Sequence, residues 1–315
     1  MGISIGNAKV ITNEAKRVPF KGLSILSLGR MDIYFTYENL KKIAKEYDFK
    51  LFPFNITLHQ QPAYKAMGYM SDDSFFGSLG CSEYKSLDFS NYESVDYIFD
   101  LNNPDVPKEL IERFDIILDS GTIEHVFHIP NVLNNLFKML KIDGKIIHMS
   151  PSSNNIDHGF YMFSPTLFSD YYEANKFDIN TLQLVRFYPY ERFLPWKVSN
   201  YTPGCLDGYS LTGLLKDGIY LIICIVTKKR ESTTGNLIPQ QGSCLISWGI
   251  KQQQKDEHAV VKHKITLRHL IGVLVGASFA KIRCRYGHTL IYLRYLFPIF
   301  QTVKRIAKRD FMREY

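Results

Sequence analysis

Short apolar runs, separated by polar or amphipathic stretches, dominate the chain between residues 22 and 227. Continuous apolar runs of this kind are typical of strands that are buried on both faces of a sheet. The runs are Gly22–Gly29, Tyr84–Asp88, Val95–Asp100, Phe114–Leu118, Lys145–Met149, Ile179–Tyr188 and Gly218–Thr227. The pattern therefore predicts seven strands, with helical segments between several of them, as in an α/β fold.

Three of the intervening segments carry helix signals. Two have apolar stripes at helical spacing, formed by Leu40, Ile43, Ala44 and Tyr47 and by Leu133, Leu136, Phe137 and Leu140. Pro130 suits the first turn of the second helix, and Gly144 is expected to end it in a left-handed cap. The pair Ser164–Pro165 is a cap and first-turn signal for a third helix, which we expect to run through about Asn175.

Residues 114–151 form the most informative stretch of the chain. They read FDIILDSGTIEHVFHIPNVLNNLFKMLKIDGKIIHMSP, which is a strand, an acidic turn, a Glu-His pair, a helix and a second strand. This order predicts one right-handed parallel β-α-β unit. It places Asp119, Glu124 and His125 after the carboxyl end of a strand, where open α/β sheets bind ligands.

The remaining segments are less regular. Residues 1–20 are expected to be an irregular arm, and residues 50–83, aromatic and without a sustained period, an insertion that folds over the site. Residues 230–263 are polar and predict a linker, with a short strand or docking segment at Cys244–Ile250. The predicted organisation is thus an arm, a main domain over 21–229, a linker, and a helical tail over 264–315.

The net charge of +7 is unevenly distributed. Residues 251–315 hold 14 Lys and Arg against 4 Asp and Glu, so the rest of the chain is slightly acidic. Three interpretations of this basic tail stay open. A solvated helical hairpin is the simplest, docking on a membrane surface is the second, and nucleic-acid binding is the least favoured because no reader motif is present.

Length, cysteine usage and termini narrow the class further. With 315 residues, 45% of them hydrophobic, the chain is long enough for one large or two ordinary domains. Five scattered cysteines without C-x-x-C spacing argue against a disulfide framework or a zinc site. The first residues lack a hydrophobic signal core, and the longest apolar runs are too short to span a bilayer. We expect a cytoplasmic protein that is at most peripheral on the inner face of the membrane.

The motifs FDII, IEHV and the helix ending in LKIDGK follow one another as they do in a known family. The chain resembles class I S-adenosylmethionine-dependent methyltransferases, whose corresponding pattern is FDxV, LEHV and LKPGG. The resemblance implies an α/β, doubly wound, seven-stranded Rossmann-like sheet that ends in an antiparallel strand hairpin. The motifs LGR, SLDxSxYE, DLN, DSGTIEHVF and PSSNNxxHGFYMFSP, between Leu28 and Pro165, are also similar to a poorly characterised bacterial group associated with surface-glycan biosynthesis.

The resemblance assigns residues to the cofactor S-adenosylmethionine. Asp88 would accept the ribose hydroxyls, and the alternative is a turn residue after the strand. The adenine, methionine and first-strand contacts would come from Asp100, Leu101 and Asn102, from Asp119, Ser120 and Gly121, and from Gly29 and Arg30. The usual E/DxGxGxG turn after the first strand is absent, and Gly29 lies 59 residues before Asp88 instead of about 20.

Glu124, His125 and His158 are the candidate catalytic residues, because methyl transfer usually requires removal of a proton from the acceptor. His125 could instead satisfy a backbone group at a helix entry, and the loop around His158 could be a self-bonded turn. His148, inside a strand, is expected to be a core residue. The Glu-His-x-x-His run at 124–128 lacks helical i, i+4 ligand spacing, so no metal is expected.

The sequence therefore favours a methyltransferase that acts on a hydroxyl of a small-molecule or glycan acceptor, without a nucleic-acid partner. A nucleotide-sugar oxidoreductase is a second hypothesis, disfavoured by the absence of G-x-G-x-x-G and of a Tyr-x-x-x-Lys pair. A non-catalytic scaffold with a degenerate sheet is a third, because the glycine-rich turn is missing.

Overall fold

The computed structural model describes residues 2–188, 195–206, 217–234, 239–250 and 313–314. The sheet strands are β2 (Ser24–Leu28), β4 (Glu83–Asp88), β5 (Tyr97–Ile98), β6 (Phe114–Asp119), β7 (Leu140–Ser153), β8 (Asp178–Phe187), β9 (Lys197–Asn200), β10 (Ile219–Thr227) and β11 (Arg313–Glu314), and β1 (Gly2–Ile3) pairs separately with β3 (Asp32–Ile33). The helices are α1 (Ile5–Arg17), α2 (Tyr37–Glu46), α3 (Pro62–Ala66), α4 (Asp72–Ser78), α5 (Ile129–Met139), α6 (Pro165–Ala174) and α8 (Gly242–Ser247), with 3-10 turns η1 (Lys108–Leu110) and η2 (Ile123–His125).

The central sheet confirms the predicted fold class. Its order is β11-β9-β8-β10-β7-β6-β2-β4-β5. The pairs β5–β4, β4–β2, β2–β6 and β6–β7 are parallel, whereas β10 is antiparallel to both β7 and β8. All seven predicted strands are present, and the last two pair antiparallel as expected. This is a Rossmann-like sheet that ends in a C-terminal antiparallel pair.

The order of the strands fixes where a ligand can bind. From β2 the chain moves outward to β4 and β5, and then returns to place β6 on the other side of β2. The crossovers on the two sides of this point diverge, which opens a crevice beyond the carboxyl ends of β2 and β6. The predicted site residues at the ends of β4 and β6 therefore belong to one edge of the sheet.

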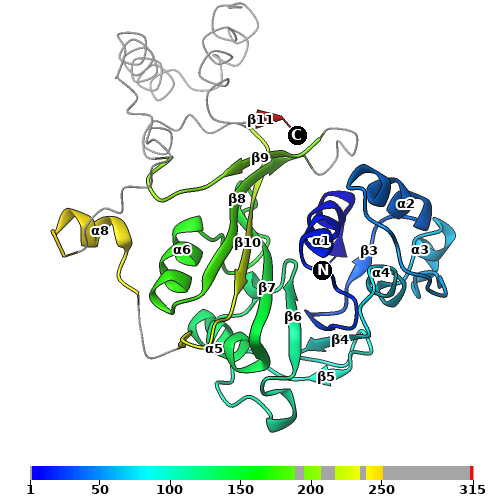
Figure 1. Cartoon of the computed structure of the whole chain (residues 1–315), viewed down its shortest axis with the longest axis horizontal. Helices are drawn as coiled ribbons and strands as arrows, with labels where there is room; N and C mark the ends of the chain where they lie inside the picture. The colour runs from blue at the N-terminus through cyan, green and yellow to red at the C-terminus, as the bar shows by residue number, and fades with distance from the viewer. Residues whose placement is uncertain (1, 189–194, 207–216, 235–238, 251–312, 315) are drawn as a thin grey trace, which may run out of the picture.

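Helices cover both faces of the sheet, as Figure 1 shows. One core contains Val132 and Leu136 of α5 and Phe168 and Tyr172 of α6. The other contains side chains of α1, α2 and α4, namely Ala8, Ile11, Leu40, Ile43, Phe75 and Phe76. Along β2, Ile25 and Leu26 join opposite cores. The central strands β2, β6 and β7 have long apolar runs because both of their faces are buried.

The amino-terminal segment differs from the expected irregular arm. Ser4 caps α1, and the main-chain N–H of Ser4 donates to Asn7 in a capping box. Ala8, Ile11 and Ala15 face the core at helical spacing. The expectation of an irregular arm is therefore wrong.

The segment after α5 also differs from the prediction. Helix α5 ends at Met139 and β7 begins at Leu140, so the strand starts five residues earlier than expected. The left-handed residue is Asp143, with φ of 61°, and not Gly144. Gly144 is needed for space, because a Cβ there would lie 2.9 Å from the carbonyl oxygen of Asp115.

Residues 50–83 are more deeply integrated than an insertion that only covers a site. Phe75 and Phe76 of α4 are core residues, and the Phe76 ring stacks on the ring of Tyr84 in β4 at 4.4 Å. The ring of Tyr64 in α3 packs edge-to-face on that of Tyr34 at 5.5 Å.

Beyond the last central strand, packed contacts continue into the predicted linker. The hydroxyl of Ser232 donates to the carbonyl of Lys176, and the N–H of Thr233 donates to that of Asn175. The expected strand around Cys244 is wrong, because α8 occupies that place. The predicted helical tail lies outside the described residues, apart from β11, which pairs with β9 instead of being helical.

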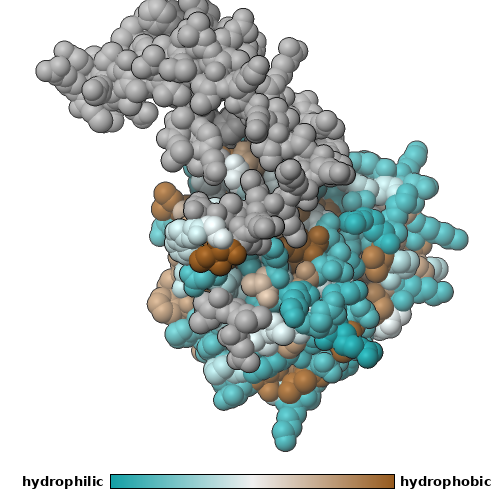
Figure 2. Space-filling model, turned by 60° about the vertical axis from the view of Figure 1, so that its left-hand side comes forward, coloured by the Kyte–Doolittle hydropathy of each residue, from teal (hydrophilic) through white to brown (hydrophobic). Residues whose placement is uncertain are grey.

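The surface of the described part is mainly hydrophilic in the view of Figure 2, where hydrophobic patches are small and separated. Among the described residues, no helix combines the length and the apolar character needed to cross a bilayer.

Candidate functional site

Two cavities lie at the carboxyl edge of the sheet and share His125 as a common wall. The β4–β5 cavity has a volume of about 560 Å³ and is lined by Leu87, Asp88, Phe89, Phe99, Asp100, Leu101, Asn102, Thr122, His125 and Val126. The β6–β7 cavity has a volume of about 360 Å³ and is lined by Gly2, Asn7, Tyr34, Ser120, Gly121, Glu124, His125, Met149, Pro151, Asn155, His158, Phe187, Ile219 and Leu221.

The β4–β5 cavity brings together four residues predicted to bind cofactor. Asp88 is half-buried at the end of β4, and its Oδ1 accepts a long hydrogen bond of 3.4 Å from the N–H of Ser90. Asp100 accepts from both the main-chain N–H and the side-chain amide of Asn102, at 2.9 and 2.8 Å. Leu101 is buried beside them. The turn chemistry considered for Asp88 is thus present, and Asp100 has it too, but it leaves most of the Asp88 carboxylate available to a ligand.

Gly29 and Arg30 follow β2 but line neither cavity. Gly29 has a φ of 79° and donates its N–H to the carbonyl of Leu87, so it makes the tight turn that leads away from the sheet. Arg30 pairs with Asp72 of α4 at 3.2 Å and donates to the carbonyl of Ser94 at 2.9 Å. In this structure Arg30 ties α4 to the loop after β4.

Asp119, Ser120 and Gly121, at the carboxyl end of β6, have two different roles: the first supports the turn, and the other two line a cavity. Asp119 is fully buried, and one of its oxygens accepts from the main-chain N–H groups of Thr122 and Ile123 at 3.1 and 3.3 Å. Its other oxygen lies 2.8 Å from Nδ1 of His148. Asp119 therefore fixes the turn from beneath, whereas Ser120 and Gly121 line the β6–β7 cavity.

His148 is a core residue, as predicted. It is fully buried, and its second ring nitrogen lies 2.6 Å from the hydroxyl of Tyr172.

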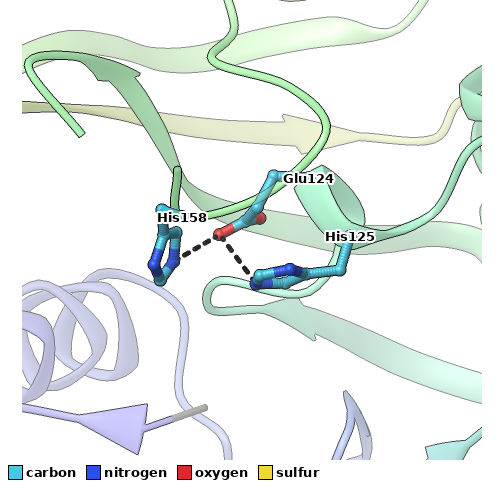
Figure 3. Close-up of side chains that lie close together, drawn as sticks. All are labelled: Glu124, His125 and His158. Atoms are coloured by element: carbon cyan, nitrogen blue, oxygen red, sulfur yellow. Dashed lines mark ion pairs between the residues drawn. The ribbon is translucent and has the colours of Figure 1, made fainter. Parts of the chain in front are cut away.

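Glu124, His125 and His158, the three predicted catalytic residues, converge in one cluster (Figure 3). Nε2 of His158 lies 3.5 Å from Oε1 of Glu124, and Nε2 of His125 lies 4.0 Å from the same oxygen. The Glu124 side chain is fully buried, whereas both imidazoles are about half exposed. Neither carboxylate oxygen of Glu124 has a hydrogen-bond partner within the described part of the chain.

Backbone contacts hold the cluster together. The carbonyl of Glu124 accepts hydrogen bonds from the N–H groups of Phe160 and Tyr161, at 2.8 and 3.2 Å. The Tyr161 hydroxyl donates to the carbonyl of Phe127 at 2.7 Å. A Cβ on Gly159 would lie 2.9 Å from the carbonyl oxygen of Glu124, so only glycine allows this approach. The loop that carries His158 is therefore fastened to η2, which carries Glu124 and His125.

The surroundings change the acid–base properties of the cluster. Burial, assisted by the negative charge of Asp119, raises the pKa of Glu124 from 4.5 to about 8. Burial also lowers the pKa of His125 below its usual value, and the neighbouring imidazole of His158 lowers it further. Near neutral pH, Glu124 can therefore hold or release a proton. Strongly shifted pKa values in a cavity are typical of functional sites.

The amino-terminal segment and the β2–α2 connection supply cavity residues that the sequence patterns did not indicate. Asn7 of α1 donates to the Ser120 hydroxyl at 3.5 Å, and it lines the β6–β7 cavity with Gly2 and Tyr34. A Cβ on Gly2 would lie 2.2 Å from the Tyr34 ring, so a larger residue there would displace that ring. The cap at Ser4 and the apolar spacing after it were the available signals for this segment.

No family model and no curated protein matches the sequence. Among solved structures, one match is a SAM-dependent methyltransferase from Archaeoglobus fulgidus, at 12% identity and a TM-score of 0.36. The match covers 70% of this chain and 94% of that one. A second match is 1,6-didemethyltoxoflavin-N1-methyltransferase from Burkholderia thailandensis, at 11% identity and a TM-score of 0.33. It covers 71% of this chain and 78% of that one. TehB from Haemophilus influenzae matches at 10% identity and a TM-score of 0.38, and the match covers 70% of this chain and 62% of that one.

Proposed function

We propose that this protein is an S-adenosylmethionine-dependent methyltransferase that methylates a hydroxyl group. The observation that carries the proposal is the pair of adjoining cavities at the switch point of the sheet, with His125 between them. One cavity has the carboxylate and the apolar wall that a nucleoside needs. The other has a buried acid and two imidazoles beside a space for a second molecule.

The β4–β5 cavity fits the adenosine part of the cofactor. Asp88 lines it with a carboxylate that has one long hydrogen bond to its own turn, so it can accept the two ribose hydroxyls. Leu101 and Val126 offer apolar contact for an adenine ring, and the Asp100–Asn102 turn gives a fixed polar edge. When bound, S-adenosylmethionine supplies an activated methyl group on a sulfonium.

The β6–β7 cavity fits an acceptor that has hydroxyl groups. Asn7, Asn155 and Tyr34 line it with amides and a phenol that can hydrogen-bond a sugar-like molecule. An acceptor hydroxyl must lose its proton as the methyl group arrives, and it would meet Glu124 and His158 there. These side chains hydrogen-bond the hydroxyl and accept its proton, directly or through a water molecule, as the oxygen–methyl bond forms and the methyl–sulfur bond breaks.

An exposed aromatic pair supports a sugar or glycan-linked acceptor. Phe127 and Phe160 stand two residues beyond His125 and His158, and their rings pack edge-to-face at 5.8 Å. Both are well exposed, at 60% and 68%. Aromatic faces of this kind suit the apolar face of a sugar ring. This agrees with the resemblance to a group associated with surface-glycan biosynthesis, which stays a proposal.

Two rival functions are weaker on specific observations. A nucleotide-sugar oxidoreductase would use a glycine-rich turn after the first strand, where this chain has only the turn at Gly29. A non-catalytic scaffold gives no reason to keep a buried carboxyl group without a hydrogen-bond partner, because such a group costs stability.

Calorimetry on the full chain tests the proposal. We expect one equivalent of S-adenosylmethionine or S-adenosylhomocysteine to bind, with no binding of NAD(H) or NADP(H). Binding of a nicotinamide cofactor instead would favour the oxidoreductase, and binding of neither class would favour the scaffold.

A further inference from the structure

The carboxylate of Glu124 is the least satisfied polar group in the site. It is fully buried, and no described residue donates a hydrogen bond to either of its oxygens. The imidazole nitrogens stand 3.5 and 4.0 Å away, beyond the roughly 2.7–3.2 Å of a hydrogen bond. Because an isolated buried carboxylate is costly, such a group is protonated, paired with a cation or bound to a metal ion. At these distances, the two imidazoles do not satisfy the Glu124 carboxyl group.

The spacing of the three donor atoms suits binding of one ion by all three residues. One ligand atom each from Glu124, His125 and His158 can be chosen so that all lie within 4.8 Å of one another. Ligand atoms about 2.0–2.1 Å from a tetrahedral ion are roughly 3.3 Å apart. Side-chain shifts of about 1 Å would therefore close the cluster onto an ion. Figure 3 shows both imidazoles directed at the same oxygen of Glu124.

The identity of the donors selects the kind of ion. Two imidazole nitrogens and one carboxylate oxygen suit Zn²⁺ and related first-row transition ions, whereas Mg²⁺ prefers oxygen ligands alone. Three protein ligands with an open position are typical of catalytic sites, in which water or substrate takes the fourth place. Glu124, His125 and His158 all line the β6–β7 cavity, so the open position would face that space.

The frame of the cluster is already in place. Phe160 and Tyr161 donate to the Glu124 carbonyl, which sets the His158 loop against η2. The sequence suggested a different pair, His125 and His128, whose spacing predicted no metal. His128 instead precedes α5, and its exposed ring packs edge-to-face on Phe127. The structure replaces His128 with a histidine from another loop.

We propose that Glu124, His125 and His158 bind one divalent transition-metal ion of the Zn²⁺ type. Binding of the ion stands on the geometry alone. Its role rests on the proposed methyl transfer: an acceptor hydroxyl bound in the open position becomes more acidic and gives up its proton to water. With an ion bound, Glu124, His125 and His158 would act as its ligands instead of as proton acceptors, and the ion would supply the acidification of the acceptor hydroxyl.

The test is metal binding by the full chain after treatment with a chelator and dialysis. Equilibrium dialysis against micromolar Zn²⁺, read by elemental analysis, is expected to give one equivalent. Co²⁺ provides a second readout through its visible absorption. The variants are Glu124→Gln and His158→Ala, with His128→Ala as the matched control. Loss of one ligand should weaken Zn²⁺ binding at least on the order of 100-fold, because even outer-shell changes cost 10- to 100-fold.

Each outcome decides the proposal. One equivalent in the wild type and His128→Ala, with loss in both ligand variants, supports it. No binding to the wild type, or equal binding to all four proteins, overturns it, and the latter would place the ion elsewhere, for example on a cysteine. Circular dichroism checks folding, and the exposed position of His158 keeps the test valid if Glu124→Gln misfolds. S-adenosylhomocysteine binding by the same samples separates failure of this proposal from failure of the methyltransferase assignment.

Discussion

The two cavities at the sheet edge differ in how their polar side chains are satisfied. In the β4–β5 cavity, Asp100 and Asn102 bond to each other within one short turn. In the β6–β7 cavity, Glu124 has no hydrogen-bond partner among the described residues, and its nearest polar neighbours include His158 from a distant loop. Local turn chemistry thus builds a rigid rim suited to recognition. Packing between distant loops instead leaves a buried carboxyl group without hydrogen bonds. Such groups persist mainly where function requires them, so this cavity suits chemistry.

The largest expected effect separates chemistry from recognition. His158→Ala should lower the rate of methyl transfer to a hydroxyl acceptor by about 10²-fold or more, the usual size of a lost catalytic group. Its affinity for S-adenosylhomocysteine should stay within about twofold, because His158 lines only the β6–β7 cavity. Initial rates and calorimetry measure the two effects, with His128→Ala as the control. A parallel collapse of both would erase the distinction between the cavities.

A substitution in the β4–β5 cavity should affect cofactor binding alone. Asp88→Ala removes the carboxylate assigned to the ribose hydroxyls, and a charge-assisted hydrogen bond contributes roughly 1.5–3 kcal/mol. We therefore expect affinity for S-adenosylhomocysteine to fall on the order of tenfold or more, with Zn²⁺ binding unchanged. Asp105→Ala, an exposed carboxylate in the loop after β5, is the matched control. Unchanged cofactor affinity in a folded Asp88→Ala protein would remove Asp88 from the site.

A smaller expected effect tests the claim that backbone contacts of its loop position His158. Gly159→Ala would put a Cβ 2.9 Å from the Glu124 carbonyl oxygen and displace the hydrogen-bonded loop. We expect a loss of about 1 kcal/mol in stability, together with faster hydrogen exchange at the amide of Phe160. Exchange measured by NMR, at unchanged cofactor affinity, checks this. Normal protection at Phe160 would mean that the loop tolerates the methyl group.

The smallest effect is a pH dependence of stability in the metal-free protein. The pKa of Glu124 is about 8 in the folded state, above the 4.5 of an ordinary glutamate, so folding favours its protonated form. Stability should therefore fall as pH rises from about 4.5 through 8, with Asp119, His125 and His158 as the titratable neighbours. Glu124→Gln lacks this loss, so its Tm relative to the wild type should be higher at pH 9 than at pH 5, by a few °C. Equal differences at the two pH values would contradict the buried-acid interpretation.

The sequence predicted the parts of the fold that depend on local patterns. The central strands β2, β6, β7 and β10 were found because they are largely buried on both faces, and α6 was found because Ser164 and Pro165 mark its start. Helix α1 was missed because its many polar residues hide the spacing of Ala8, Ile11 and Ala15. The early start of β7 was missed because Asp143–Gly144 imitates a helix stop.

The site was predictable only as a set of residue types. Asp88 and Glu124 stand next to strand ends, so their place at the sheet edge follows from topology. The burial of Glu124 does not, because it depends on the loop that Gly159 allows to close over η2. Nor can spacing choose between His128 and His158 as a partner for His125, since they belong to different loops and only folding brings one of them close.

A crystal structure of the full chain with S-adenosylhomocysteine would test the central claim most directly. We predict adenine against Leu101 and Val126, the ribose hydroxyls at Asp88, and the sulfur directed past His125 toward the β6–β7 cavity. A ligand bound outside the β4–β5 cavity, or one whose ribose does not contact Asp88, would contradict the assignment.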